Sequence, residues 1–320
     1  MTRLSLLITS ASLAMASAVS AQSVDPELPE YSPVSGVSGN LVSIGSDTLN
    51  NLMTLWSEGF RQHYPNVAIQ IQGAGSGTAP PALIEGTAQF GPMSRAMRGS
   101  EIETFEARFG YEPLPLRGAI DGIGVFVHRD NPVTCISMQE VDAIFSSTRA
   151  GGADAAITSW GQVGATGEWA DRPIAMYGRN SASGTFGFFR DVALFGGDYS
   201  AEVREQPGSS TVIQGVASDM NGIGYSGVGY ATADVRALDI RGEDGECYGP
   251  EDAASGNYPI ARFLFVYMNV DPNAELEPLR AEFVRYVYSQ EGQQDVVRAG
   301  FFPINTFVAN GDLELFGLLD

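Results

Sequence analysis

The stretch GNLVSIGSDTLNNLMTLWSEGFRQHYPNVAIQIQG, residues 39–73, constrains the fold more than any other part of the chain. It begins with a short apolar strand over 41–44 and ends with a strand over 67–71 in which apolar and polar residues alternate. Between these strands, apolar side chains recur at the spacing of an amphipathic helix, at Leu49, Leu52, Met53, Trp56 and Phe60. A strand–helix–strand unit of this length predicts parallel strands and an α/β fold.

Three predicted strands run into turns that are rich in glycine and hydroxyl residues and that open a helix. They are residues 45–48 (GSDT), 75–78 (GSGT) and 181–185 (SASGT). A helix N-terminus offers backbone N–H groups without partners and the positive end of the helix dipole. A single turn of this kind is more often an ordinary helix cap. Three of them together describe a cup of uncharged donors around a small tetrahedral anion.

Arg179 lies four residues before Ser183, at the third of these turns. Its guanidinium is a planar fork of donors, which suits an oxyanion. A surface arginine in an ion pair is the ordinary alternative. The position beside a helix start favours the binding role, so we expect Arg179 to supply the full positive charge of the cup.

The composition excludes several other functions. The formal net charge is −20, and all eighteen basic residues are arginine. A chain without lysine has no Walker A loop, Schiff-base lysine or Ser–Lys dyad. The acidic excess argues against a nucleic-acid partner. The two histidines, His63 and His128, have no ligand-spaced neighbour, so we predict no metal site and no cofactor.

The N-terminus predicts export. MTR is followed by an apolar stretch of small residues and by Val19-Ser20-Ala21, so residues 1–21 read as a cleaved signal peptide. Residues 22–38 are rich in proline and serine and predict a flexible leader. The two cysteines, Cys135 and Cys247, are compatible with a disulfide in an oxidising compartment or with two buried thiols, and the sequence leaves both open.

The turns occur in the order of the ligand loops of the phosphate-binding proteins of the PstS family. GSDTL, GAGSGT, FGPMSRAM and above all GRNSASGT followed by FGFF resemble these loops, and YPIARFLFVYMN and GFFPI resemble the closing strands. The likeness covers residues 39–305. It implies a type II-like periplasmic binding protein, in which two α/β lobes are joined by a two-strand hinge. Lobe 1 would comprise 39–127 plus 263–320, and lobe 2 would comprise 128–262.

By position, the resemblance implies phosphate contacts in both lobes. From the family's loops these contacts are Thr48, Leu49 through its backbone N–H, Ser76, Arg179, Ser183, Gly184 and Thr185. The same turns add the neighbouring residues Ser46, Gly77, Ser94 and Arg95.

One position departs from the family pattern. Ser94, followed by Arg95, stands where well-known members have an aspartate that accepts a proton from bound phosphate. An ionised carboxylate rejects sulfate, which carries no proton to donate. Asp47 and Asp121 are the candidates to replace that aspartate.

The resulting hypothesis is a monomeric, non-enzymatic periplasmic protein that binds inorganic phosphate and delivers it to the permease of an ABC transporter. Binding of sulfate or another oxyanion by the same fold is one alternative. A secreted phosphoester hydrolase is a second, and a sensory or adhesive binding module without a transporter partner is a third.

Overall fold

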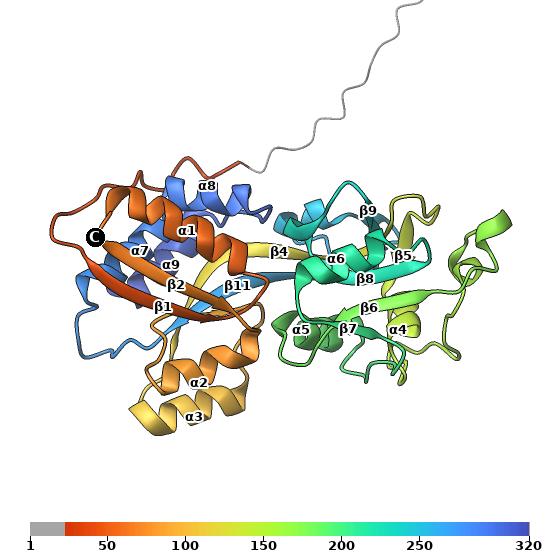
Figure 1. Cartoon of the computed structure of the whole chain (residues 1–320), viewed down its shortest axis with the longest axis horizontal. Helices are drawn as coiled ribbons and strands as arrows, with labels where there is room; N and C mark the ends of the chain where they lie inside the picture. The colour runs from red at the N-terminus through yellow and green to blue at the C-terminus, as the bar shows by residue number, and fades with distance from the viewer. Residues whose placement is uncertain (1–22, 320) are drawn as a thin grey trace, which may run out of the picture.

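The computed structural model describes residues 23–319, which form two lobes lying side by side (Figure 1). The predicted signal peptide, residues 1–21, lies outside the described residues. Helices and strands occur in both lobes, and the main sheet passes from one lobe to the other. The predicted α/β architecture of two lobes is therefore confirmed.

The helices are α1 (Asn50–His63), α2 (Ala79–Ile84), α3 (Gly99–Phe109), α4 (Met138–Phe145), α5 (Gly184–Ala193), α6 (Ser209–Ala217), α7 (Pro278–Val287), α8 (Gln290–Arg298) and α9 (Thr306–Leu315). The strands are β1 (Gly39–Gly45), β2 (Val67–Gly73), β3 (Gly91–Met93), β4 (Leu114–His128), β5 (Cys135–Ser137), β6 (Ala175–Arg179), β7 (Arg204–Gln206), β8 (Gly222–Gly227), β9 (Val235–Arg241), β10 (Cys247–Tyr248) and β11 (Ala261–Met268).

The unit β1–α1–β2 has the predicted form. β1 and β2 pair in parallel, from Gly39 opposite Val67 to Gly45 opposite Gly73. The five apolar side chains predicted for the buried face of α1 are all fully buried. Trp56 of this set also donates its indole N–H to the carbonyl of Gly292 in α8, over 2.8 Å. Burial of this face thus holds α1 against the C-terminal helices.

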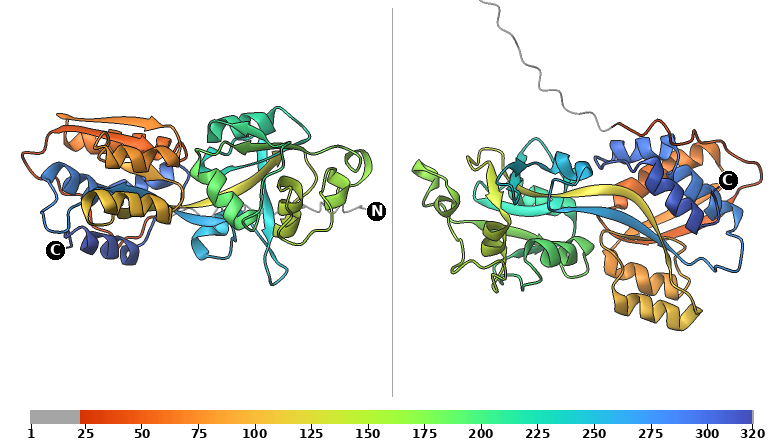
Figure 2. Two further views of the ribbon diagram at one scale, coloured as in Figure 1. Left: turned by 90° about the horizontal axis from the view of Figure 1, so that it is seen from below. Right: turned by 180° about the vertical axis from the view of Figure 1, so that it is seen from behind.

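Two long strands, β4 and β11, connect the lobes. They pair with each other in antiparallel orientation, and β4 pairs further along with β8 and β9 of the second lobe. In the right view of Figure 2, the yellow β4 and the blue β11 run side by side from one lobe into the other. The two-strand hinge is thus present. The residue limits assigned to each lobe stay a prediction, because both strands contribute to both lobes.

Each lobe buries its own hydrophobic core. In the first lobe, Trp56 and Phe60 of α1 pack with Phe283 of α7. In the second lobe, Phe145 of α4 and Tyr225 of β8 belong to a separate cluster. Because the two cores are separate, the lobes can rotate about the hinge without losing their internal packing.

Residues 23–38 correct one prediction, since they pack against the first lobe instead of forming a flexible leader. Leu28 and Tyr31 are part of the first-lobe core. The Tyr31 hydroxyl donates to the carboxylate of Glu282 over 2.9 Å, and the Asp25 carboxylate accepts from the backbone N–H of Thr306. A few buried side chains therefore order a segment whose average composition is that of a linker.

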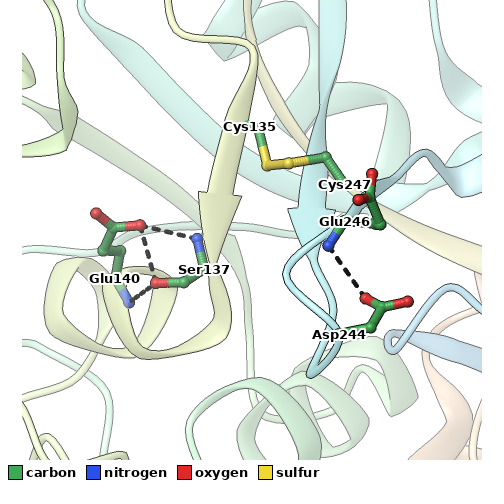
Figure 3. The surroundings of a disulfide bond; sticks show 6 residues. All are labelled: Cys135, Ser137, Glu140, Asp244, Glu246 and Cys247. Carbon is green, nitrogen blue, oxygen red and sulfur yellow. Dashed lines mark hydrogen bonds between the residues drawn. A yellow bond between two sulfur atoms is a disulfide. The ribbon is translucent and has the colours of Figure 1, made fainter.

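Cys135 and Cys247 form a disulfide, which decides between the two alternatives (Figure 3). β5 and β10, which carry the two cysteines, both pair with β9. Beside the disulfide, Ser137 caps α4 by accepting from the backbone N–H of Glu140. The disulfide therefore ties two short edge strands of the second lobe together.

Candidate functional site

Loops from both lobes meet where the hinge holds the lobes face to face. Across this boundary, the Thr48 and Thr185 hydroxyls share a hydrogen bond of 3.0 Å. Gly77 donates its backbone N–H to the carbonyl of Ala182 over 3.1 Å. The structure therefore brings the three predicted turns together, two from the first lobe and one from the second.

The predicted hydroxyl residues of these turns are buried. Each has at most 2% of its surface exposed: Ser46, Thr48, Ser76, Ser94, Ser183 and Thr185. Buried hydroxyl groups need hydrogen-bond partners, because water no longer supplies them. The hydrogen bonds that these hydroxyls already make within the protein therefore indicate what kind of ligand they can bind.

Two of these hydroxyls, those of Ser76 and Ser183, accept a hydrogen bond from a backbone N–H. The Ser76 oxygen accepts from the backbone N–H of Ser94 over 3.0 Å. The Ser183 oxygen caps α5 by accepting from the backbone N–H of Thr185 over 3.1 Å. An N–H group can only donate, so each of these two hydroxyls uses a lone pair in this bond and keeps its proton for another partner, which for Ser76 includes the Ser94 hydroxyl 3.2 Å away. A ligand that accepts hydrogen bonds, as an oxyanion does, fits such groups.

Arg179, at the end of β6, is 1% exposed and adds a positive charge to the cup. Its two terminal nitrogens donate to the Ser209 hydroxyl over 2.7 Å and to the Pro207 carbonyl over 3.2 Å. Its Nε–H has no hydrogen-bond partner within residues 23–319. Burial lowers the pKa of the Arg179 guanidinium, against the opposing charge of Asp47. Arginine nevertheless stays protonated in proteins, so this N–H remains a buried donor.

Asp47 connects the first lobe to the second. Its Oδ2 accepts from the backbone N–H of Ser209 over 2.8 Å and lies 3.3 Å from the Arg179 guanidinium. The Tyr230 hydroxyl donates to the carbonyls of Asp47 and Thr48, over 2.9 and 3.1 Å. Burial raises the pKa of Tyr230, so its phenol stays protonated as a donor. The first ligand turn is therefore held in place by residues of the second lobe.

Asp121 lies at the back of the cup, where Arg262 binds it. The Asp121 Oδ2 accepts from the Arg262 Nη2 over 2.8 Å, and Oδ1 accepts from the Val228 N–H over 3.3 Å. Burial raises the pKa of the Asp121 carboxyl, against the opposing charge of Arg262. Sequence reasoning included Asp121 but missed Arg262. The signal was present, because a single arginine in the apolar strand ARFLFVYM must have a partner when it is buried.

Arg95 has a different partner from the one that its sequence position suggested. Its terminal nitrogens form two hydrogen bonds of 2.7 Å with the Glu101 carboxylate at the start of α3. One of them also donates to the carbonyl of Ala96. Both terminal nitrogens of the Arg95 guanidinium thus donate to residues of the first lobe. These bonds give no support to the prediction that Arg95 contacts the ligand.

The remaining predicted residues of the turns are Leu49, Gly77 and Gly184. The Leu49 side chain is fully buried in the first-lobe core, directly before α1. Gly184 opens α5 so close to the first lobe that a Cβ atom there would lie 2.3 Å from the Ser76 hydroxyl and 2.7 Å from the Ser94 hydroxyl. At Gly77 a Cβ atom would stay 3.5 Å from its nearest neighbour. Of these two glycines, therefore, Gly184 must lack a side chain for the lobes to meet, whereas Gly77 need not.

Two α/β lobes, a two-strand hinge and a buried cup of donors between them define a ligand-binding protein of the hinged, two-lobed class. The sequence profile of the PBP superfamily domain matches residues 31–291. The phosphate-binding protein PstS of Pseudomonas aeruginosa PAO1 is 50% identical over 316 residues, which cover 98% of this chain and 97% of that protein. The chain belongs to the PBP superfamily and, within it, to the family of the phosphate-binding protein PstS.

More distant matches include a further sequence relative and two solved structures. The phosphate-binding protein PstS of Bacillus subtilis is 29% identical over 277 residues, covering 86% of this chain and 84% of that protein. A crystal structure of a substrate-binding protein of a phosphate ABC transporter from Clostridium perfringens matches 83% of this chain and 100% of that one, with a TM-score of 0.70 and 23% identity. A phosphate transport receptor from Vibrio cholerae matches 82% of this chain and 100% of that one, with a TM-score of 0.64 and 22% identity. These structures share the fold.

Membership of this family of binding proteins makes the chain a non-enzymatic protein, so the hydrolase alternative is dropped. No helix within residues 23–319 combines the length and the apolar character that crossing a membrane requires. In the same part of the chain, no three His, Cys, Asp or Glu side chains gather in a way that could hold a metal ion.

The contact at Gly184 yields a matched pair of variants. Gly184→Ala should keep the lobes apart, because its Cβ atom would overlap the Ser76 and Ser94 hydroxyls, whereas Gly77→Ala should be tolerated. Overpacking of this kind costs about 1–3 kcal/mol. Small-angle X-ray scattering should show a larger radius of gyration for Gly184→Ala alone. Equal radii for the two variants would contradict the contact.

Proposed function

We propose that this protein binds inorganic phosphate in the periplasm and delivers it to the permease of an ABC transporter. The observation that carries the proposal is the buried Nε–H of Arg179, which has no partner within residues 23–319. Arg179 ends β6, four residues before Ser183, which caps α5 at the third turn. The relatives from Pseudomonas aeruginosa and Bacillus subtilis are named for phosphate binding, which supports this choice of oxyanion.

The phosphate contacts in this proposal come from both lobes. They are Ser46, Thr48, the backbone of Leu49, Ser76, Gly77 and Ser94 of the first lobe, and Arg179, Ser183, Gly184 and Thr185 of the second.

The net charge of −20 does not prevent anion binding. A hydrogen bond to a charged group contributes about 1.5–3 kcal/mol, and micromolar affinity needs about 8 kcal/mol in total. About eight to ten donors in a dry cleft therefore outweigh the surface field, which salt screens beyond about 8–10 Å. Short-range donors thus decide the affinity, and the surface charge has little effect.

We assign the role of proton acceptor to Asp47. Its Oδ1 makes no hydrogen bond within residues 23–319, whereas both carboxylate oxygens of Asp121 already have N–H partners. An ionised carboxylate accepts the proton of monohydrogen phosphate and repels sulfate. Asp47 would therefore compensate for Ser94 and keep the site selective for phosphate.

Replacing Arg179 tests the site directly. Arg179→Ala should raise the Kd for phosphate by about a hundredfold, because it removes the charged donor of the cup. Arg95→Ala serves as the matched control, since Arg95 bonds to Glu101, and its Kd should stay close to that of the unmodified protein. Titration calorimetry measures both. Unchanged phosphate binding by Arg179→Ala would refute the proposed site.

Replacing Asp47 tests the selectivity. Asp47→Asn should raise the Kd for phosphate by about tenfold and lower the Kd for sulfate, because the amide no longer repels an unprotonated oxyanion. Competition between phosphate and sulfate at pH 8 measures the ratio of the two constants. If this ratio equals that of the unmodified protein, Asp47 is not the selecting acid.

Delivery is tested in cells that lack their own phosphate-binding protein. The full chain should restore uptake of radiolabelled phosphate, and a chain without residues 1–21 should not, because only the former is exported. A control with Arg179→Ala should restore little uptake, because it lacks the charged donor. Restored uptake without residues 1–21, or none with the full chain, would contradict the transport role.

A further inference from the structure

We infer that Arg262 is a positioning residue that couples closure of the hinge to the donor geometry of the anion cup. It lies on the hinge strand β11, outside the predicted ligand loops. The inference rests on the proposed phosphate binding and names the residue that makes that site depend on closure.

Arg262 is anchored to the second hinge strand. On the β-ladder it stands directly opposite Asp121 of β4, and its Nε and Nη2 donate to the Asp121 Oδ2 over 3.2 and 2.8 Å. The two side chains are 3% and 0% exposed. Removing both charges from water is costly, so such a pair is weak support for stability and is better explained by a specific positional role.

The same guanidinium reaches one ligand turn from each lobe. Its Nη1 donates to the carbonyl of Ser94 in the first lobe, and its Nη2 donates to the Thr185 hydroxyl in the second lobe over 2.9 Å. The ring of Phe188 in α5 lies 5.2 Å from the guanidinium carbon. These contacts exist together only when the two lobes face each other. Opening of the hinge must therefore break at least one of them.

Arg262 also fixes which way the Thr185 hydroxyl points. A guanidinium has only donors, so the Thr185 oxygen must accept from it. The hydroxyl proton of Thr185 is then left for donation towards Thr48 or towards an anion in the cup. Without Arg262, both lone pairs of the Thr185 oxygen would be free, and one of them could face the anion and repel it. Closure of the hinge thereby occupies one lone pair of Thr185 and favours donation of its proton.

The contact with Ser94 acts in the same direction. A free carbonyl oxygen beside the cup would repel an anion, and Arg262 neutralises this one by bonding to it. Asp121 in turn holds Arg262 in place. This explains why a buried carboxylate can stand behind an anion site without acting as the acid that selects the ligand.

The experiment compares Arg262→Met with a matched control on the other hinge strand. Arg117 of β4 also binds an aspartate, donating its Nε to Asp312 over 2.9 Å, but this partner belongs to α9 of the first lobe. Arg262→Met should raise the Kd for inorganic phosphate by about ten- to a hundredfold. Arg117→Met should leave it within about threefold, since it touches only one lobe. Titration calorimetry gives both values.

A double-mutant cycle with Thr185→Val separates positioning from general destabilisation. If Arg262 acts through Thr185, the double variant should bind phosphate about as weakly as the weaker single variant. Small-angle scattering should show that the decrease in radius of gyration caused by phosphate is smaller for Arg262→Met than for Arg117→Met. Independent, multiplying effects on the Kd, or an undiminished decrease in radius, would overturn the inference.

The outcomes also separate this inference from the proposed function. If the unmodified protein fails to bind phosphate, the proposed function is wrong. If it binds and Arg262→Met binds equally well, only the role of Arg262 is wrong. If Arg262→Met does not fold, Arg262→Lys is the test variant, because lysine keeps the positive charge but lacks the planar set of donors of the guanidinium. It should bind phosphate about tenfold more weakly, and an unchanged Kd would overturn the inference.

Discussion

Polar groups removed from water between the two lobes must find partners, and the rest of the structure depends on this requirement. Two buried guanidiniums, those of Arg179 and Arg262, lie at the boundary together with a set of buried hydroxyls. Each arginine has a carboxylate partner, Asp47 and Asp121 respectively. The pairs balance the charges, while the hydroxyls of Ser76 and Ser183 accept from backbone N–H groups and keep a proton to donate. The boundary between the lobes therefore suits a small ligand that accepts hydrogen bonds.

The separate hydrophobic cores explain how such a boundary can open and close. Each lobe keeps its own packing, so closure exchanges polar contacts such as those between Thr48 and Thr185 and between Asp47 and Ser209. Individual hydrogen bonds contribute about 0.5–1.5 kcal/mol net. A ligand that adds several more can therefore shift the balance between open and closed forms. Because Arg262 contacts Ser94 and Thr185 together only in the closed form, the donor geometry of the anion site depends on the position of the hinge.

Local patterns predicted the elements well where the determining contacts are close in the sequence. The apolar spacing of α1 and the alternation in β2 follow from the side chains of those segments alone. The segment 23–38 was mispredicted, because Leu28 and Tyr31 find their partners in distant helices. Arg95 is only six residues from its partner Glu101, but no pattern in the sequence distinguishes this ion pair from a contact with a ligand.

The sequence by itself determined the α/β class, the three hydroxyl-rich turns and the arginine that accompanies the third of them, because spacing and helix capping are local properties. Only the tertiary structure decided that these turns meet, that Cys135 and Cys247 are bonded, and that Arg262 joins Asp121, Ser94 and Thr185. These contacts connect residues far apart in the chain. Their partners are chosen by the pairing of β4 with β11 and by the way the hinge brings the two lobes together.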